Sequence, residues 1–430
     1  MTPMGWTLAE KIVSSHAGGI PVAPGDAVFV HPDLVSLDER QAERLLDLLE
    51  ESGETWPRGG ELLRVIPGHF AATSDPGRAS VYRRLRQFFE QQEWTGLSPL
   101  GRGGSLAVGT IDGGYAIPGH LVLGSDGHLS DAGAVGCLGL PVSEGRLIRA
   151  LAGQPIELKV PASIRVRLAG TPGRWCTGLD VMLRLLNELG KDRLLDRVVE
   201  LHGPALDHMD MIDRLAMTSV GFEAGLRSVL LGTDETTLAW LRARTEKALA
   251  HLLPDGDAAY EERLELNLDG WEPMVALAPS PYGARPVSEL PEIPVDQVVI
   301  GHRAGGRVED LRLVARLLNE HPVHGNLRLL IVPGSQKIFQ HCAEEGLVAT
   351  LVRVGALVAT PMMDLWESDQ GGTLGEGEVC LTTTTENRTG WQGPASAKIH
   401  FSSPAVAAAT AAMGRIAHPD EVLRSRRESA

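Results

Sequence analysis

Cysteine is scarce in this chain of 430 residues, and no two of its cysteines have the spacing of a metal-binding pair. The four are Cys137, Cys176, Cys342 and Cys380. Scattered single cysteines are expected to be reduced, buried thiols of a cytoplasmic protein. The cysteine pattern by itself therefore predicts no thiolate-bound metal centre.

Other absences exclude further classes of protein. The chain lacks an apolar run of about 20 residues, so no membrane-spanning helix is expected. Its start, Met1 to Trp6, lacks the charged-then-apolar pattern of an export signal, so cytoplasmic localisation is expected. Basic residues number 40 against 55 acidic ones, and the formal net charge is −15. A nucleic-acid partner is not expected either, because binding phosphates needs a basic face.

The length and pattern of the chain predict several α/β domains. A chain of 430 residues is too long for one ordinary core, and 43% apolar residues fit a globular enzyme. Helical and strand patterns alternate, which indicates α/β layering. The pattern shifts towards strand near Val160, and residues 278–294 hold five prolines and one glycine, as a linker would. We therefore predict domains over 1–158, 159–280 and 281–430.

Several elements carry start and stop signals. Thr177 precedes a periodic apolar run that stops at Gly190. Ser403 and Pro404 are a typical cap and first position of a helix, and Gly414 is a typical stop. The predicted helices are 38–49, 81–92, 178–189, 307–320 and 404–413, and the predicted strand is 116–123.

A series of motifs along the chain carries a family resemblance. They are Val-Ala-Pro-Gly-Asp at 22–26, Gly-His-Leu-Val-Leu-Gly-Ser-Asp-Gly-His at 119–128, Ile-Gly-His-Arg-Ala-Gly-Gly-Arg-Val-Glu-Asp-Leu at 300–311, Val-Pro-Gly-Ser at 332–335 and Ser-Pro-Ala-Val-Ala-Ala-Ala at 403–409. In order and spacing the chain resembles the large subunits of 3-isopropylmalate dehydratase, in the aconitase superfamily. The resemblance implies a three-domain aconitase-type α/β/α core without the swivelling fourth domain. It also implies a separate small subunit as partner, and hence a hetero-oligomer.

The resemblance includes a loss. The family holds a 4Fe–4S cluster with three cysteines, and these positions fall on Arg303, Ala359 and Met362. Alanine cannot bind iron, and arginine has no lone pair to offer at neutral pH. We therefore predict that the cluster is absent and that no other cofactor takes its place. A guanidinium at 303 would either bind an anion in the former cluster space or fill that space as a plug, and both readings stay open.

Four residues are candidates for proton transfer. Asp126 and His128, two apart in a turn, would face the same way, and a carboxylate beside an imidazole fixes its tautomer. The family has Asp-Ser-His there, so Gly127 replaces a serine. The structural alternative is a turn in which Asp126 caps backbone amides. The resemblance places Glu223, in a helical stretch, on a glutamate that contacts the leaving water, and places His69 on a family histidine.

The substrate-binding positions are the most altered. The family signature Asn-Arg-Asn-Phe-x-Gly-Arg-Gln-Gly falls on residues 385–393, so its two arginines become Glu386 and Trp391. Glutamate would repel a carboxylate that an arginine would grip. The substrate is therefore expected to have fewer carboxylates, a basic group, or an apolar part that stacks on the indole. The predicted binding residues are His302, Arg303, Arg307, Glu386, Arg388, Trp391 and Gln392.

Three functions remain as hypotheses. The first is a cluster-free hydro-lyase or isomerase that acts on a specialised carboxylate of secondary metabolism, with a serine of the small subunit as base. The second is a non-catalytic binding or scaffold subunit, since so many family residues are replaced. The third is a mononuclear-metal hydro-lyase, in which His69, Asp126, His128 and His302 would hold one divalent ion.

Overall fold

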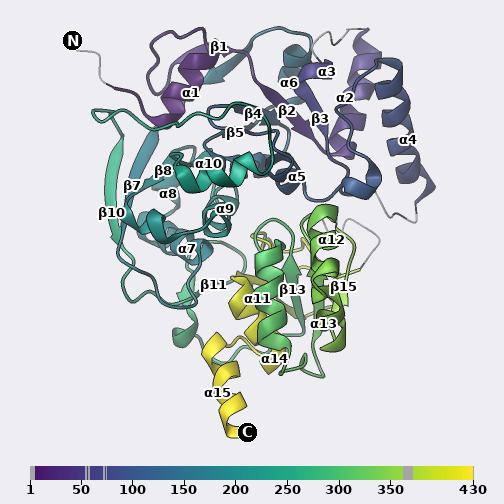
Figure 1. The fold of residues 1–430 in the computed structure, drawn as a ribbon, viewed down its shortest axis with the longest axis vertical. Coiled ribbons are helices and arrows are strands. Elements are labelled where there is room, and N and C mark those ends of the chain that lie inside the picture. Colours follow the sequence, from purple (N-terminus) through teal and green to yellow (C-terminus); the bar gives the residue numbers. More distant parts are fainter. Residues whose placement is uncertain are drawn as a thin grey trace. The chain divides into compact units, whose positions relative to one another are not determined.

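The computed structural model describes residues 5–53, 56, 59–70, 73, 75–361 and 371–429. The chain divides into two compact units (Figure 1). Both contain parallel β-sheets joined by helices, so the predicted α/β class is confirmed. The predicted domain boundaries after residues 158 and 280 stay predictions. Unit 1 comprises Met1–Leu100, Leu106–Ala169 and Asp192–Asn267, and unit 2 comprises Gly101–Ser105, Gly170–Lys191 and Leu268–Ala430.

The first sheet of unit 1 has the order β3-β2-β4-β5, and its neighbouring strands are parallel. The predicted strand at 116–123 begins later than expected, because Gly119 has a φ of +86° and turns the chain just before β4. A separate antiparallel pair joins β1 (Ala27–Val30) to β6 (Ile156–Lys159). The strands of the sheet are β2 (Leu34–Leu37), β3 (Leu63–Val65), β4 (Leu121–Gly124) and β5 (Leu138–Pro141).

The second sheet of unit 1 has the order β10-β7-β8-β9 and is also parallel. The inner strand β8 is buried on both faces over Val198–Leu201, whereas β7 alternates buried apolar residues with half-buried arginines. The edge strand β10 instead alternates charged and apolar residues. The strands are β7 (Ser163–Ala169), β8 (Val198–His202), β9 (Ser228–Leu231) and β10 (Glu262–Asn267).

The helices of unit 1 begin at side-chain caps. Asp38 accepts a hydrogen bond from the backbone N–H of Gln41, so α2 starts at residue 39, in agreement with the prediction. Helix α4 starts earlier than the predicted residue 81, because Asp75 caps it and Pro76 occupies its first position. The helices of unit 1 and its borders are α1 (Leu8–His16), α2 (Glu39–Ser52), α3 (Gly59–Leu62), α4 (Pro76–Gln91), α5 (Leu106–Asp112), α6 (Glu144–Leu151), α8 (Lys191–Leu194), α9 (Met211–Ser219) and α10 (Glu235–Arg242), with the 3₁₀ helices η1 (Leu100–Arg102), η2 (Gly127–Val135) and η3 (Pro204–His208).

Unit 2 is built on a seven-stranded sheet of order β12-β11-β17-β16-β13-β14-β15. The five strands from β17 to β15 are parallel, and β11 and β12 add to one edge in antiparallel pairing. Part of the predicted linker 278–294 is therefore structured, since Arg285 and Pro286 of β12 pair with β11 and η4 follows. The elements are β11 (Met274–Ala276), β12 (Arg285–Pro286), η4 (Val287–Glu289), β13 (Gln297–Gly301), β14 (Arg328–Val332), β15 (Leu357–Val358), β16 (Val379–Thr382) and β17 (Lys398–Ser402).

Two helices of unit 2 have the predicted bounds. Helix α7 runs from the Thr177 cap to Gly190, and α14 ends at Gly414, which has a left-handed φ of +72°. Helix α11 is shorter than the predicted 307–320, because Arg307 is its cap and not its first turn. Among the described residues, no helix combines the length and the apolar character needed to cross a membrane. The helices are α7 (Gly178–Leu189), α11 (Val308–Leu318), α12 (Gln336–Glu344), α13 (Leu347–Arg353), α14 (Pro404–Met413) and α15 (Pro419–Ser429).

Candidate functional site

Unit 1 brings Asp126, His128 and Glu223 together. Asp126 follows strand β4, and its Oδ1 lies 2.8 Å from Nδ1 of His128. Nε2 of His128 lies 3.1 Å from Oε1 of Glu223. Glu223 is not in a helix as predicted, because α9 ends at Ser219 and the chain turns before Gly225, whose φ is +83°. The imidazole is therefore held between two carboxylates, one at each ring nitrogen.

This arrangement suits proton transfer. Asp126 accepts the hydrogen bond of one ring nitrogen, which fixes the tautomer and the orientation of the ring, and Glu223 addresses the other nitrogen. The side chain of His128 is 15% exposed and that of Glu223 is 4% exposed. The structural alternative is also realised, since Asp126 accepts a hydrogen bond from the backbone N–H of His128 and caps η2. Capping and orientation of the imidazole are thus two functions of one carboxylate.

Gly127 lies where only a glycine fits. A Cβ at this position would lie 2.0 Å from two ring carbons of Phe222, which packs edge-on against His128 with ring centroids 5.5 Å apart. The exchange of the family's serine for glycine is therefore linked to the aromatic ring that supports the histidine.

Gly127→Ser is expected to lower the free energy of unfolding by about 1–3 kcal/mol, the usual cost of overpacking. Urea unfolding measures this loss. Phe222→Ala added to Gly127→Ser removes the ring that the new Cβ meets, so the double variant should recover part of the loss. A single variant as stable as the original chain would contradict the contact.

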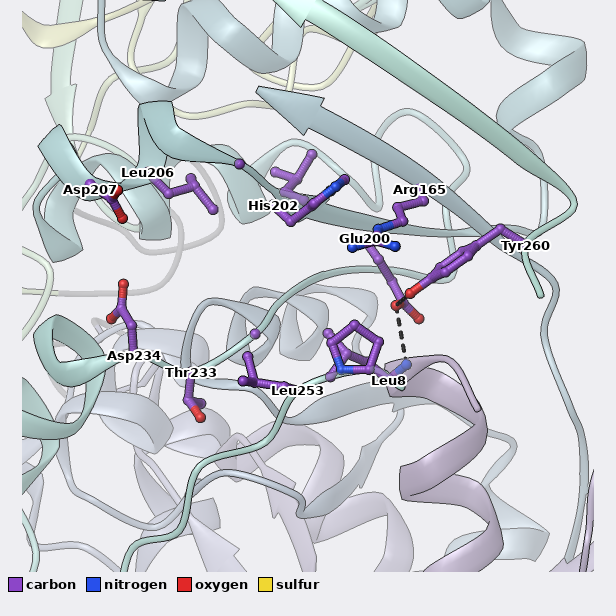
Figure 2. Close-up of a pocket in the computed structure, with 14 residues that line it drawn as sticks. Leu8, Arg165, Glu200, His202, Leu206, Asp207, Thr233, Asp234, Leu253 and Tyr260 are labelled. Atoms are coloured by element: carbon purple, nitrogen blue, oxygen red, sulfur yellow. Dashed lines mark hydrogen bonds between the residues drawn. The ribbon is translucent and has the colours of Figure 1, made fainter. Parts of the chain in front are cut away.

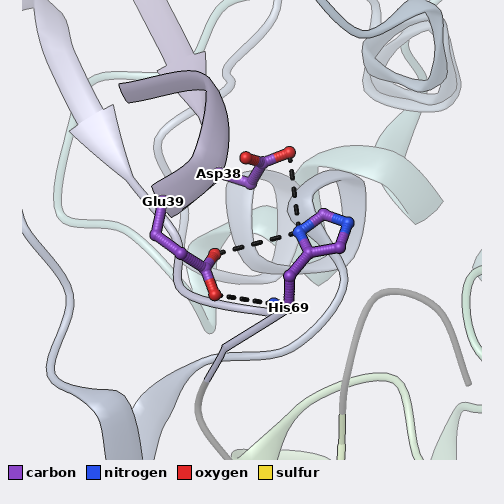
Figure 3. Close-up of side chains that lie close together, drawn as sticks. All are labelled: Asp38, Glu39 and His69. Atoms are coloured by element: carbon purple, nitrogen blue, oxygen red, sulfur yellow. Dashed lines mark hydrogen bonds and ion pairs between the residues drawn. The ribbon is translucent and has the colours of Figure 1, made fainter. Parts of the chain in front are cut away.

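His69 belongs to a second cluster in unit 1 (Figure 3). Its Nδ1 lies 3.7 Å from Oδ2 of Asp38 and 3.9 Å from Oε2 of Glu39, and all three side chains have no exposed surface or almost none. Burial raises the pKa of Asp38 to about 6. His69 therefore has its own carboxylates and does not form a metal-ligand group with Asp126 and His128 among the described residues. The predicted catalytic role of His69 stays a prediction, and its buried ring offers no exposed atom to a substrate.

In unit 2 the predicted binding residues follow the carboxyl ends of neighbouring parallel strands. His302 and Arg303 follow β13, and Glu386 follows β16 by a few residues. The chain leaves β13 towards β14 on one side, whereas β16 continues to β17 on the other. The gap between β13 and β16 is thus a topological switch point, which is where open α/β sheets bind ligands.

Arg303 spans this switch point. Its Nη2 donates a 2.7 Å hydrogen bond to Oγ1 of Thr385, and its side chain is 4% exposed. Beside it, Nε1 of Trp391 donates a 3.0 Å hydrogen bond to Oε2 of Glu386. The guanidinium of Arg388 lies 5.7 Å from the centroid of the Trp391 ring, within cation–π distance. The residues that replace the two family arginines therefore contact one another.

The remaining predicted binding residues are buried. Gln392 is 1% exposed, and no described residue forms a hydrogen bond with its side-chain amide. Arg307 is 5% exposed and its backbone N–H donates to Asp310. His302 is 6% exposed and has a left-handed φ of +68°. A buried amide without partners among these residues costs about 1–3 kcal/mol, so Gln392 suits a polar ligand.

Two of the three positions that align with cluster cysteines of the family lie at the carboxyl end of the same sheet. Arg303 follows β13 and Ala359 follows β15, and these strands flank β14 on either side. Ala359 and Trp391 both pack against the same buried group of Val299, Leu330 and Cys380. Met362 lies outside the described residues. The assignment of these positions to former cluster ligands stays a prediction.

Unit 1 also contains a cavity of about 320 Å³ that no sequence pattern indicated (Figure 2). Asp207 and Asp234 lie at one end of it, and Glu200 and Tyr260 lie at the other. Glu200 accepts hydrogen bonds from the backbone of Leu8, from the next residue, from Ser163 and from Tyr260. Glu200 therefore links the start of α1 to β8 at one end of the cavity.

The model of the "Aconitase family (aconitate hydratase)" matches residues 71–292 and 282–414. The chain belongs to the aconitase family. The predicted aconitase-type α/β core is therefore confirmed, and so is the resemblance to dehydratase large subunits.

Several members of the family that are similar to this chain along nearly its whole length carry one name. The "3-isopropylmalate dehydratase large subunit" of Moorella thermoacetica is 34% identical over 421 residues, which cover 98% of this chain and 100% of that protein. The protein of the same name from a Sulfurihydrogenibium species is 32% identical and covers 98% of both chains. Among solved structures, the holo form of aconitase X from Thermococcus kodakaraensis has a TM-score of 0.46 and 12% identity, and the match covers 83% of this chain and 84% of that one.

Sequence reasoning missed several partners of the predicted residues. Asp38 and Glu39 were recognised only as a helix start, although they surround His69. Thr385 was assigned to an aligned signature, although it binds Arg303. These pairs are separated by about 30 and 82 positions along the chain, and only the folded sheet brings them together.

Proposed function

We propose that this chain is the large subunit of a cluster-free hydro-lyase or isomerase of the aconitase family, acting on a specialised carboxylate substrate. The observation that carries the proposal is the imidazole of His128 between the carboxylates of Asp126 and Glu223. A charge-flanked, partly exposed histidine is suited to general acid–base catalysis. The similarity to 3-isopropylmalate dehydratase large subunits supports the reaction class, and a small subunit is the partner that this similarity suggests.

The donor set of the chain does not fit a 4Fe–4S cluster. Arg303 and Ala359 offer no thiolate at the sheet edge. Burial raises the pKa of Cys380 to about 12 and that of Cys342 to about 11, so both remain protonated at neutral pH, and Cys137 is buried in unit 1. Sγ of Cys176 donates to the carbonyl of Trp271. No step of the proposed reaction therefore uses a cluster.

The residues of unit 2 are proposed to select the substrate. Arg303 places a buried guanidinium after β13, and a guanidinium is the group that binds a carboxylate through two parallel hydrogen bonds. Gln392 adds a buried amide without partners among the described residues. Glu386 and Trp391 replace the family arginines with an acid and an apolar face, so a second carboxylate would be disfavoured. The expected substrate has one carboxylate for Arg303 and an apolar or basic part for the Glu386–Trp391 pair.

The proposed chemistry is a β-elimination or its reverse. A base, for which a serine of the small subunit is the family's precedent, removes the proton from the carbon next to the carboxylate. His128 gives its Nε2 proton to the leaving hydroxyl, which departs as water while the C–O bond breaks and the double bond forms. General acid catalysis contributes about 10²–10⁴-fold, whereas a Lewis acid would supply several kcal/mol more. The leaving hydroxyl should therefore be activated, as it is beside a second electron-withdrawing group.

The test uses the full chain purified with the small-subunit homologue encoded nearest to it. Hydration of unsaturated monocarboxylates and dicarboxylates with apolar or basic substituents is followed by the loss of enoate absorbance. Activity with both subunits, and none with either alone or with the small-subunit serine changed to alanine, supports the proposal. Binding without turnover across the panel would instead favour the scaffold hypothesis. Stoichiometric iron and sulfide in an anaerobic preparation would overturn the cluster-free part.

A further inference from the structure

The Asp38–Glu39–His69 cluster holds three ionisable side chains that are buried from solvent. The side chains of Asp38, Glu39 and His69 have no exposed surface in the structure (Figure 3). A buried carboxylate is costly unless a positive charge or hydrogen bonds compensate it. Two carboxylates beside one neutral imidazole carry a charge of −2, and a protonated imidazole would still leave −1.

Besides their hydrogen bonds to the backbone, Asp38 and Glu39 each direct one carboxylate oxygen towards the ring of His69. Oε1 of Glu39 accepts the backbone N–H groups of His69 and Phe70, and Oε2 accepts that of Gly68. Oδ1 of Asp38 accepts the N–H of Gln41. Oδ2 of Asp38 is buried and accepts no hydrogen bond from the described residues. It points, with Oε2 of Glu39, at Nδ1 of His69 (Figure 3).

The distances between these atoms fit a metal ion better than a proton or a water molecule. Nδ1 lies 3.7 Å from one carboxylate oxygen and 3.9 Å from the other, and all three atoms lie within 4.8 Å of one another. A direct hydrogen bond would need about 2.7–3.2 Å, and a water bonded to both atoms would hold them about 4.5 Å apart. Two ligands of one ion with bonds of about 2.0–2.2 Å lie about 3.3–3.9 Å apart when the angle between them at the ion is about 110–125°.

We propose that Asp38, Glu39 and His69 bind one divalent transition-metal ion, of the zinc or manganese class. Imidazole and carboxylate are the ligands that these ions accept together. The ion makes the cluster electrically neutral, since +2 balances the two carboxylates while His69 stays uncharged. It joins the first turn of α2 to the segment after β3, which are about 30 residues apart.

The ion has a structural function. Its ligands are sealed from solvent, so no substrate reaches it, and it differs from a catalytic ion shared by His69, His128 and His302. This inference does not depend on the proposed hydro-lyase activity, and its measurements need no substrate.

The test is metal content and thermal stability of the full chain. After dialysis against a chelator, Zn²⁺, Mn²⁺ and Co²⁺ are added singly, bound metal is measured by mass spectrometry and the Tm by calorimetry. We expect one equivalent of Zn²⁺ or Mn²⁺ to bind and the Tm to rise by about 5 °C or more. Co²⁺ at the site should show visible d–d absorption.

Asp38→Asn is the informative variant, because asparagine still caps α2 but loses the ligand charge. It should bind metal at least about 100-fold more weakly and lose the metal-dependent rise in Tm. Asp75→Asn is the matched control, because Asp75 caps α4 in the same way and lies outside the cluster. Its metal binding should equal that of the original chain.

Two results would overturn the site. One is less than a tenth of an equivalent of each metal in the original chain, with no change in Tm. The other is equal metal binding in the original chain and in Asp38→Asn, which would place the ion elsewhere. If Asp38→Asn without metal is more stable than the original chain and the latter takes up no metal, the cluster is held by a shared proton instead.

Discussion

His128→Asn is expected to lower kcat by about 10²–10⁴-fold with KM little changed, the range that general acid–base catalysis supplies. Asparagine can keep a hydrogen bond to Asp126, so the turn after β4 should stay folded, but it cannot give up a proton at neutral pH. The measurement is steady-state kinetics of the two-subunit protein with its best substrate.

Glu223→Gln is the companion variant. It keeps a group that can hydrogen-bond to Nε2 of His128 but removes the charge, so its kcat should fall less than that of His128→Asn. Unchanged unfolding curves in both variants would show that the effect is catalytic. Turnover within about threefold of the original in His128→Asn would remove the histidine from the reaction and with it the basis of the proposed function.

Arg303→Gln is expected to weaken substrate binding by about 2–5 kcal/mol, which is roughly 30-fold or more. The guanidinium is buried at the switch point, and a carboxylate bound there would lose the positive charge that Arg303 supplies. Isothermal calorimetry with substrate or product measures the change. Arg303→Lys keeps the positive charge but loses the pair of parallel N–H donors. Its substrate affinity should therefore lie between those of the original chain and of Arg303→Gln.

Thr385→Val helps to distinguish two roles of Arg303, which are to bind substrate or only to fill the space of the former cluster. It removes the acceptor of the 2.7 Å hydrogen bond but leaves the arginine, so affinity should fall by about 1 kcal/mol. If Arg303 only fills the former cluster space, Arg303→Met will bind substrate as well as the original chain, and Arg303→Ala will be destabilised by the cavity it leaves. That pair of results would contradict a binding role.

The local elements were predictable because their signals are local. Thr177 and Gly190 bracket α7, and Ser403 and Gly414 bracket α14, since caps and left-handed stops act within one turn of a helix. The prediction for Glu223 was wrong in its local structure because an apolar period continues past the point where two glycines end α9. The short β12 was missed because its pairing with β11 is not encoded in its own sequence.

The candidate site was predicted in its residues more than in its contacts. The alignment with the family predicts that Arg303 and Ala359 lie near each other. In the structure both follow the carboxyl ends of strands of one sheet. Arg303 contacts Thr385 because β13 pairs with β16, a strand much later in the chain, and this pairing cannot be read from the local sequence. The carboxylates around His69 were invisible for the same reason, because α2 and β3 meet only after folding.

The hydrogen-bonded ladder of the large sheet in unit 2 stops at Gly301 in β13 and at Val358 in β15. Arg303 lies beyond the last pair of β13, and Ala359 adds to the sheet only through its backbone N–H, which donates to the carbonyl of Ile331, so neither side chain takes part in strand pairing. Substitutions of these side chains can therefore change the chemistry at the end of the sheet without breaking the hydrogen bonds between its strands. The side chains that follow the strands can therefore change independently of the sheet that positions them.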